Sequence, residues 1–242
     1  MKETDDSAAL ARQYGLEAIP ECVARLTELV ARQDADLDHL AKVISQDPEL
    51  TSRLLRAANP RSQDESEYGV TTVDGALMRN GVGCVLVLAM VAPLVRAVVK
   101  TFQTMLSLKA ELINPRSADP IVEEHVLAAI RFSGKAVGGV QVRLRVETAR
   151  WIAATLLGVP PDELTDPAAL SDAIGELANI IAGNLKSNLC DAGLECALGA
   201  PRISRTTEFR AKPVAGGSLE RMAFRASQFV FFVDLTVNPW SG

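Results

Sequence analysis

The chain has few of the residues that build metal centres and disulfide frameworks. It contains two histidines and four cysteines in 242 residues. The cysteines show no pairing at metal-ligand spacing, and two histidines are too few for most His-based metal centres. We therefore expect no metal site, and buried thiols in a reducing, cytoplasmic setting. These residues are His39, His125, Cys22, Cys84, Cys190 and Cys196.

Net positive charge and a membrane-spanning run are also missing from the sequence. The formal net charge of −5 argues against nucleic acid or an anionic membrane as the main partner. Residues 81–95 are uncharged and largely apolar, but Arg96 follows them, which leaves this run short of the roughly 20 residues that a span requires. The acidic start of the chain precedes no apolar segment, so we expect no secretory signal.

The N-terminal third of the chain carries only helical signals. Apolar residues recur at helical spacing in three segments between residues 20 and 58. A further helix is expected over residues 72–80, with Gly81 as its stop. The short breaks between these segments favour a small helical bundle over residues 16–91, preceded by a disordered tail over residues 1–15.

The remaining residues, 92–242, place helices and strands in separate runs, which is typical of an α+β domain. Val140, Val142 and Leu144 alternate with polar residues, so one face of that strand is expected to be buried. Residues 229–233 are apolar on both faces, and we expect helices to cover the second face, with another subunit as the alternative. The expected helices are 94–106, 147–157 and 171–189, and the expected strands are 121–132, 137–145, 194–204, 219–225 and 229–237.

The helix expected over residues 171–189 separates an apolar stripe from an unusual polar one. At about 100° per residue, the polar side carries an acid, an amide three residues later and a glycine beyond them. A glycine on an exposed helix face costs about 1 kcal/mol relative to alanine, so we expect it to let a partner approach closely. An ordinary amphipathic surface helix is the alternative. The apolar stripe is Ile174, Leu177, Ala178, Ile181 and Leu185, and the polar stripe is Asp172, Glu176, Asn179 and Gly183.

The spacing Asp172-x-x-x-Glu176-x-x-Asn179, with the surrounding residues 175–184, resembles the signature helix of the CheX and CheC chemotaxis phosphatases. The resemblance covers about residues 92–240, and its pieces keep their order. The helix expected over residues 94–106 holds no second Glu-x-x-Asn, so the chain is nearer to one-site CheX proteins than to CheC. The other similar pieces are residues 102–106, 130–134 and 158–164, and Pro201.

This resemblance implies a CheX-like fold of antiparallel sheet packed with helices, and hydrolysis of the aspartyl phosphate of a CheY-like response regulator. An asparagine amide has no proton that titrates near pH 7, so it cannot act as a general base, but it can orient a water. The resemblance implies that role for Asn179, a salt bridge from Glu176 to the regulator's lysine, and partner contacts at Asp172 and Gly183. The Mg²⁺ would belong to the regulator, so we expect no cofactor in this chain. The family includes homodimers that pair through the sheet, which makes a dimer plausible.

Alternatives stay open around this motif. The chain could be a non-catalytic binding or scaffold module that docks a response regulator, or another signalling partner, through the same face. We interpret two nearby amides as structural, Asn184 as a flank residue and Asn188 as part of a fraying helix end. Cys190 and Cys196 match no redox motif with a mechanism, so we expect unreactive thiols.

The helical segment over residues 16–91, called the arm below, resembles the first half of an HDOD domain, a non-catalytic signalling and interaction module. Asn80 stands where a leucine usually precedes the glycine of that family. An HD-type phosphohydrolase needs paired His and Asp ligands, which His39 lacks, so we interpret His39 as a surface helix residue. We expect the arm to recruit a partner or to pack on the phosphatase domain. The resemblance rests on residues 19–20, 44–50 and 54–59, Ala76 and Gly81.

Overall fold

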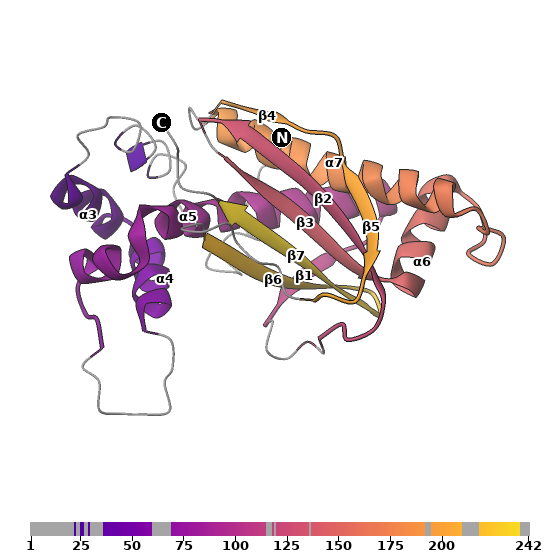
Figure 1. The fold of residues 1–242 in the computed structure, drawn as a ribbon, viewed down its shortest axis with the longest axis horizontal. Helices are drawn as coiled ribbons and strands as arrows, with labels where there is room; N and C mark the ends of the chain where they lie inside the picture. Colours follow the sequence, from indigo (N-terminus) through magenta and orange to yellow (C-terminus); the bar gives the residue numbers. More distant parts are fainter. Residues whose placement is uncertain are drawn as a thin grey trace.

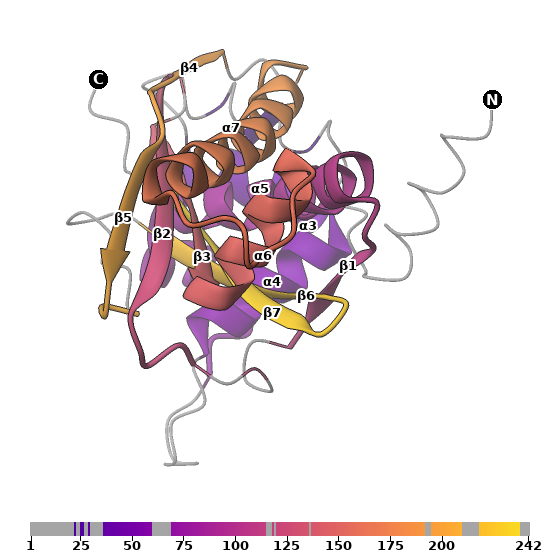
Figure 2. The same cartoon turned by 90° about the vertical axis from the view of Figure 1, so that its right-hand side faces the viewer.

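The structure is a computed structural model in which one antiparallel sheet carries helices on one face and the arm extends beyond one end (Figures 1 and 2). It describes residues 22, 25–26, 29, 36–59, 69–114, 118, 120–135, 137–191, 195–209 and 218–237, so the expected tail lies outside it. In chain order the elements are α3 (Leu37–Ser45), α4 (Pro48–Ala58), α5 (Val73–Leu106), β1 (Ala110–Ile113), β2 (His125–Gly134), β3 (Gly138–Arg145), α6 (Val146–Leu157), α7 (Pro167–Asp191), β4 (Cys196–Leu198), β5 (Arg202–Thr206), β6 (Ser218–Ala226) and β7 (Phe229–Val237).

Short acidic side chains start the helices α3 and α4 of the arm. The Asp36 carboxylate accepts a hydrogen bond from the Asp38 backbone N–H at 3.2 Å, and Asp47 accepts one from the Leu50 N–H at 3.0 Å. Both helices pack their apolar sides against each other and against α5, while His39 is exposed, as the sequence predicted. The buried apolar residues of α3 and α4 include Leu40, Ala41, Ile44, Leu50 and Leu54.

The long helix α5 joins the arm to the sheet. Gly81 was the expected stop, but the helix kinks there and continues, with φ 73° and ψ 164°, a conformation that is essentially restricted to glycine. Further along, Phe102 stacks on Phe231 of β7 with ring centroids 4.5 Å apart. Because one apolar core includes residues of the arm and of the sheet, the division between residues 91 and 92 stays a prediction. None of the helices in the described part is long and apolar enough to cross a membrane.

The sheet has seven antiparallel strands in the order β1-β6-β7-β3-β2-β4, and β5 also pairs with β2. This architecture confirms the predicted α+β class. Three details differ from the prediction. The strand β1 was not expected, β2 begins at His125 and not at residue 121, and the single strand expected over residues 194–204 is two short strands, β4 and β5. A proline at position 201 has no N–H for the strand ladder, which accounts for the break between β4 and β5.

Helices α5, α6 and α7 cover one face of the sheet (Figure 2), and residues of the loops before β2 and after β5 cover part of the other. On β7, Phe231 and Val233 belong to the main core, whereas Phe232 belongs to a small cluster with Ile121 and Ala223. The ring of Phe209 meets that of Phe232 at 4.9 Å in an edge-on contact. In the part of the chain that the structure describes, loop residues and a polar network cover this part of the face, instead of the expected second layer of helices.

Candidate functional site

The helix α7 is part of the helical layer that covers one face of the sheet. It lies away from the sheet edge that β1 forms (Figure 2). Asp166 caps it by accepting a hydrogen bond from the Ala168 N–H at 2.9 Å, and Pro167 occupies its first turn. The apolar side packs on α5, α6 and β2. The predicted apolar stripe is confirmed, because Ile174, Leu177, Ala178, Ile181 and Leu185 are all buried.

The opposite side of α7 holds the predicted site residues. Asp172, Glu176 and Asn179 are exposed, and Gly183 is half-buried on the same side. Glu176 and Asn179 are three residues apart, so their side chains are neighbours on the helix surface. No residue in the described ranges forms a hydrogen bond or an ion pair with the side chains of Asp172, Glu176 or Asn179. The structure thus brings the four residues together on one accessible face, and their roles stay predictions.

The segment between β4 and β5 lies beside α7. A Cβ added at Gly175 would lie 3.7 Å from Pro201 Cγ and 3.7 Å from Ile203 Cδ1. Gly175 directly precedes Glu176 and is one helical turn before Asn179, so Pro201 borders the polar face. Pro201 is exposed and therefore accessible from the same side as the site residues.

The two other amides of α7 form contacts within the chain. The Asn184 side chain donates to the hydroxyl of Thr101 on α5 at 3.2 Å, and Asn188 donates to the Asn184 backbone carbonyl at 2.7 Å. Thr101 is buried, and its hydroxyl donates to the Ala97 carbonyl at 2.8 Å. These contacts support a structural role for both amides. Asn188 does not lie at a fraying end, because α7 continues to Asp191.

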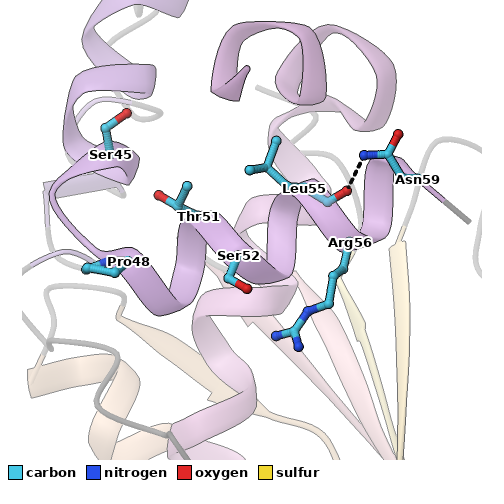
Figure 3. Close-up of a pocket in the computed structure, with 7 residues that line it drawn as sticks. All are labelled: Ser45, Pro48, Thr51, Ser52, Leu55, Arg56 and Asn59. Atoms are coloured by element: carbon cyan, nitrogen blue, oxygen red, sulfur yellow. Dashed lines mark hydrogen bonds between the residues drawn. The ribbon is translucent and has the colours of Figure 1, made fainter. Parts of the chain in front are cut away.

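The site residues lie on the surface of a helix, outside the groove that the described residues form. A groove of about 600 Å³ exists, but it lies along α4 of the arm, where Figure 3 shows Thr51, Ser52 and Arg56 on its wall. In the part of the chain that the structure describes, no group of three or more His, Cys, Asp or Glu could hold a metal ion. The polar face of α7 thus places one carboxylate, that of Glu176, beside one amide, that of Asn179. The groove is lined by Ser45, Pro48, Thr51, Ser52, Leu55, Arg56 and Asn59.

A second polar cluster, which the sequence analysis missed, lies on the opposite face of the sheet. No helix of the described ranges packs on that face, which is called the helix-free face below. The side chains of Arg143 and Asp234 are 3% and 0% exposed, and Nε and Oδ2 are 2.8 Å apart. Arg221 binds the other carboxylate oxygen, Oδ1, at 2.6 Å. A signal was present, because Asp234 interrupts an apolar strand and a buried charge requires partners.

Two protein-family models match the chain, one in its C-terminal part and one in its N-terminal part. Residues 126–223 match the family model of the chemotaxis phosphatase CheX. The chain carries a CheX-family domain. The match runs from β2 into β6 and includes α7 with Glu176 and Asn179. Residues 16–113 match the model of the HDOD domain, which extends past residue 91 to include all of α5 and β1.

Solved structures share the fold of the CheX-family domain. Similar chains are CheX from Vibrio vulnificus (22% identity, TM-score 0.52) and CheX from Desulfovibrio desulfuricans (20%, 0.50). A third is a CheC-like superfamily protein from Shewanella sp. PV-4 (18%, 0.53). Each match covers 62% of this chain, and 96%, 99% and 97% of the respective solved chain. No curated protein sequence matches the chain.

Proposed function

We propose that this protein is a phosphatase that hydrolyses the aspartyl phosphate of a CheY-like response regulator. Asn179 orients the attacking water, and Glu176 engages the regulator's lysine. The observation that carries the proposal is the pair itself. On α7 of a CheX-family domain, the two side chains are exposed neighbours without a partner in the described ranges. Side chains that hold nothing together in the fold are free to act on a substrate.

The chemistry of the substrate suits so small a catalytic set. An aspartyl phosphate is already reactive, so the phosphatase mainly has to position a water in line and to help neutralise charge. The uncharged amide of Asn179 can accept a hydrogen bond from that water through its oxygen. A salt bridge from Glu176 would draw the regulator's lysine away from the phosphoryl group and fix the docked geometry. The Mg²⁺ belongs to the regulator in this mechanism, so the chain contributes no cofactor.

The shape of the site favours a protein as the substrate. The polar face of α7 is the outside of a helix, and the groove along α4 lies elsewhere. A helix face cannot surround a small molecule, since small-molecule sites are concave. The remaining reacting groups must therefore come with a docked partner.

Asp172 and Gly183 extend the proposed docking surface on either side of the catalytic pair. A Cβ added at Gly183 would meet no neighbouring atom within 4 Å, so packing within the described chain does not require a glycine. The glycine costs about 1 kcal/mol of helix stability relative to alanine, and we assign it to close approach of the regulator. Asp172 adds negative charge one turn before Glu176, which suits a basic partner surface.

The proposal includes a cytoplasmic location and a homodimer that pairs through the sheet. All four cysteines are free, which fits a reducing compartment. Within the described ranges, β1 pairs with β6 alone, and an unpaired strand edge is a place where a second chain can add. Analytical ultracentrifugation tests the dimer. A monomer at all concentrations would remove the dimer and leave the phosphatase proposal intact.

Single-turnover decay of a phosphorylated CheY-like regulator tests the catalytic proposal. Wild-type protein should speed the decay, and Asn179→Ala should abolish most of that effect. Ser187→Ala is the control, because Ser187 is exposed on the same helix and its hydroxyl binds only the Gly183 carbonyl, at 3.2 Å. If wild type binds the regulator without changing its decay rate, the protein is a binding module.

A further inference from the structure

The helix-free face of the sheet is partly closed by loop residues that a buried polar network holds. The Glu208 carbonyl accepts a hydrogen bond from Arg143 Nη1 at 2.9 Å, and the Phe209 carbonyl accepts one from Arg221 Nη2 at 2.6 Å. Asp234 binds both guanidinium groups through its two oxygens. One carboxylate thus anchors both arginines that hold the loop after β5.

His125 connects a second loop, residues 120–124, to the same network. The imidazole is fully buried, with Nε2 3.2 Å from Arg143 Nη1 and Nδ1 3.1 Å from the carbonyl oxygen of Glu123. A guanidinium group has donors only, so Nε2 must accept and the ring proton must reside on Nδ1, where it donates to Glu123. The contacts of the ring with Arg143 and Glu123 therefore require a neutral His125.

A second proton on His125 would disrupt these contacts. It would point one N–H at another and place two positive groups 3.2 Å apart in a buried site. Asp234 cannot compensate, since its oxygens already bind Arg143 and Arg221. Further charged residues of the described ranges lie on the elements around the ring. Arg145 is opposite His125 on β3 and pairs with Glu123, and Glu124 pairs with Arg205. Glu208 follows β5, and its carbonyl binds Arg143.

The loop before His125 covers an apolar cluster. Ile121 is fully buried and packs with Ala223 of β6 and Phe232 of β7, both also buried. Phe209 borders the cluster and meets the His125 ring edge-on, with ring centroids 6.3 Å apart. Movement of residues 120–124 would expose this apolar surface, so the imidazole contacts keep it closed.

We propose that residues 120–124 form an acid-sensitive strap, which protonation of His125 releases from Arg143 to uncover the apolar cluster on the helix-free face. The strap shares no residue with α7. Its opening is therefore independent of the proposed phosphatase function.

Amide hydrogen exchange on the full chain tests the strap. The rates are measured between about pH 7.5 and about pH 5.5, the range in which histidine charges, and are corrected for the intrinsic effect of pH on exchange. Opening that takes up one proton should accelerate exchange in residues 120–124 by up to about tenfold per pH unit, while α7 keeps its protection. His125→Gln should abolish the acceleration, because glutamine can accept from Arg143 and donate to Glu123 but does not titrate. His39→Gln, at the exposed histidine of α3, should leave it unchanged.

Two results would overturn the strap. One is exchange that accelerates equally in the His125→Gln variant, or that accelerates in α7 as well as in residues 120–124. Either result would indicate general unfolding in acid. The other comes from imidazole NMR of the wild type, which stays decisive if His125→Gln does not fold. Protonation of His125 in step with the exchange supports the strap, and a ring that stays neutral throughout the acid range refutes it.

Discussion

Asn184 donates a hydrogen bond from its side-chain amide to the hydroxyl of Thr101, and this 3.2 Å contact joins α7 to α5. Thr101 is fully buried, so the contact is shielded from water. The rotation of α7 about its axis determines where Glu176 and Asn179 point. That rotation is therefore fixed by a polar contact as well as by apolar packing.

Replacing Thr101 with valine keeps the side-chain volume and removes the acceptor for Asn184. The half-buried amide then lacks a partner, which should lower the free energy of unfolding by about 1–2 kcal/mol. Thr104→Val is the matched control, because Thr104 is exposed and its hydroxyl binds only carbonyls of its own helix. Urea unfolding measures both variants. Equal losses would mean that the Asn184 contact contributes nothing of its own.

Glu220 provides a pH-dependent test of the packing between the arm and the sheet. Burial raises the pKa of this carboxyl above its ordinary value of 4.5, and the positive charge of Arg53 on α4 partly opposes the shift. The folded protein then holds the proton more tightly than the unfolded chain. Stability is lost as pH rises from the unfolded pKa through the folded one.

Glu220→Gln should therefore raise the free energy of unfolding near neutral pH and leave it unchanged below about pH 4, where both states are protonated. Chemical unfolding from acid to neutral pH measures the difference. Glu163→Gln, in the exposed segment before α7, should show no such trend. A variant less stable than wild type at neutral pH would mean that attraction to Arg53 outweighs the burial of Glu220.

The sequence predicted α7 and its two faces because a long periodic pattern determines both the helix and its buried side. It did not predict the course of α5, because a glycine that ends a helix and one that kinks it look the same in sequence. Only the packing beyond Gly81 decides between them, and that packing is tertiary. The short strand β1 was missed for a similar reason, since four residues are too few to show a period.

The alternation in β3 correctly placed Arg143 opposite Val142 and Leu144, but it could not say what covers that face. The cover comes from loops distant in sequence, which include Phe209 and Ile121. Alternation therefore predicts the side of a strand and not its exposure. The lone Asp234 in an apolar strand was the one local sign of a buried network.

The substitution Gly183→Ala should have opposite effects on the stability of the protein and on regulator binding. Alanine should stabilise the isolated protein by up to about 1 kcal/mol, because the helix gains propensity and the added Cβ meets no neighbouring atom within 4 Å. The same methyl group should weaken regulator binding if the regulator approaches this point closely. Thermal unfolding and a binding titration on the same samples measure both effects. A more stable variant that binds as well as wild type would remove Gly183 from the docking surface.

Substitutions of Glu176 and of Asn179 should impair different steps, regulator binding in the first case and the chemical step in the second. Charge-assisted contacts contribute about 1.5–3 kcal/mol when shielded, so Glu176→Gln should weaken regulator binding by roughly tenfold or more. The loss should be largest at low salt, where the missing attraction is least screened. Asn179 places a water that matters in the transition state and hardly at all in the docked complex. Asn179→Ala should therefore bind normally and turn over slowly at saturation.

Both variants should unfold at the wild-type temperature, because the two side chains are exposed and have no partner in the described part of the chain. Titration of the regulator, followed by turnover at saturating protein, separates binding from chemistry. Asp172→Asn extends the series, since it should lower affinity without changing turnover at saturation. If Glu176→Gln and Asn179→Ala lose binding equally, or if either melts several degrees lower, the polar face of α7 has a structural role and the site assignment fails.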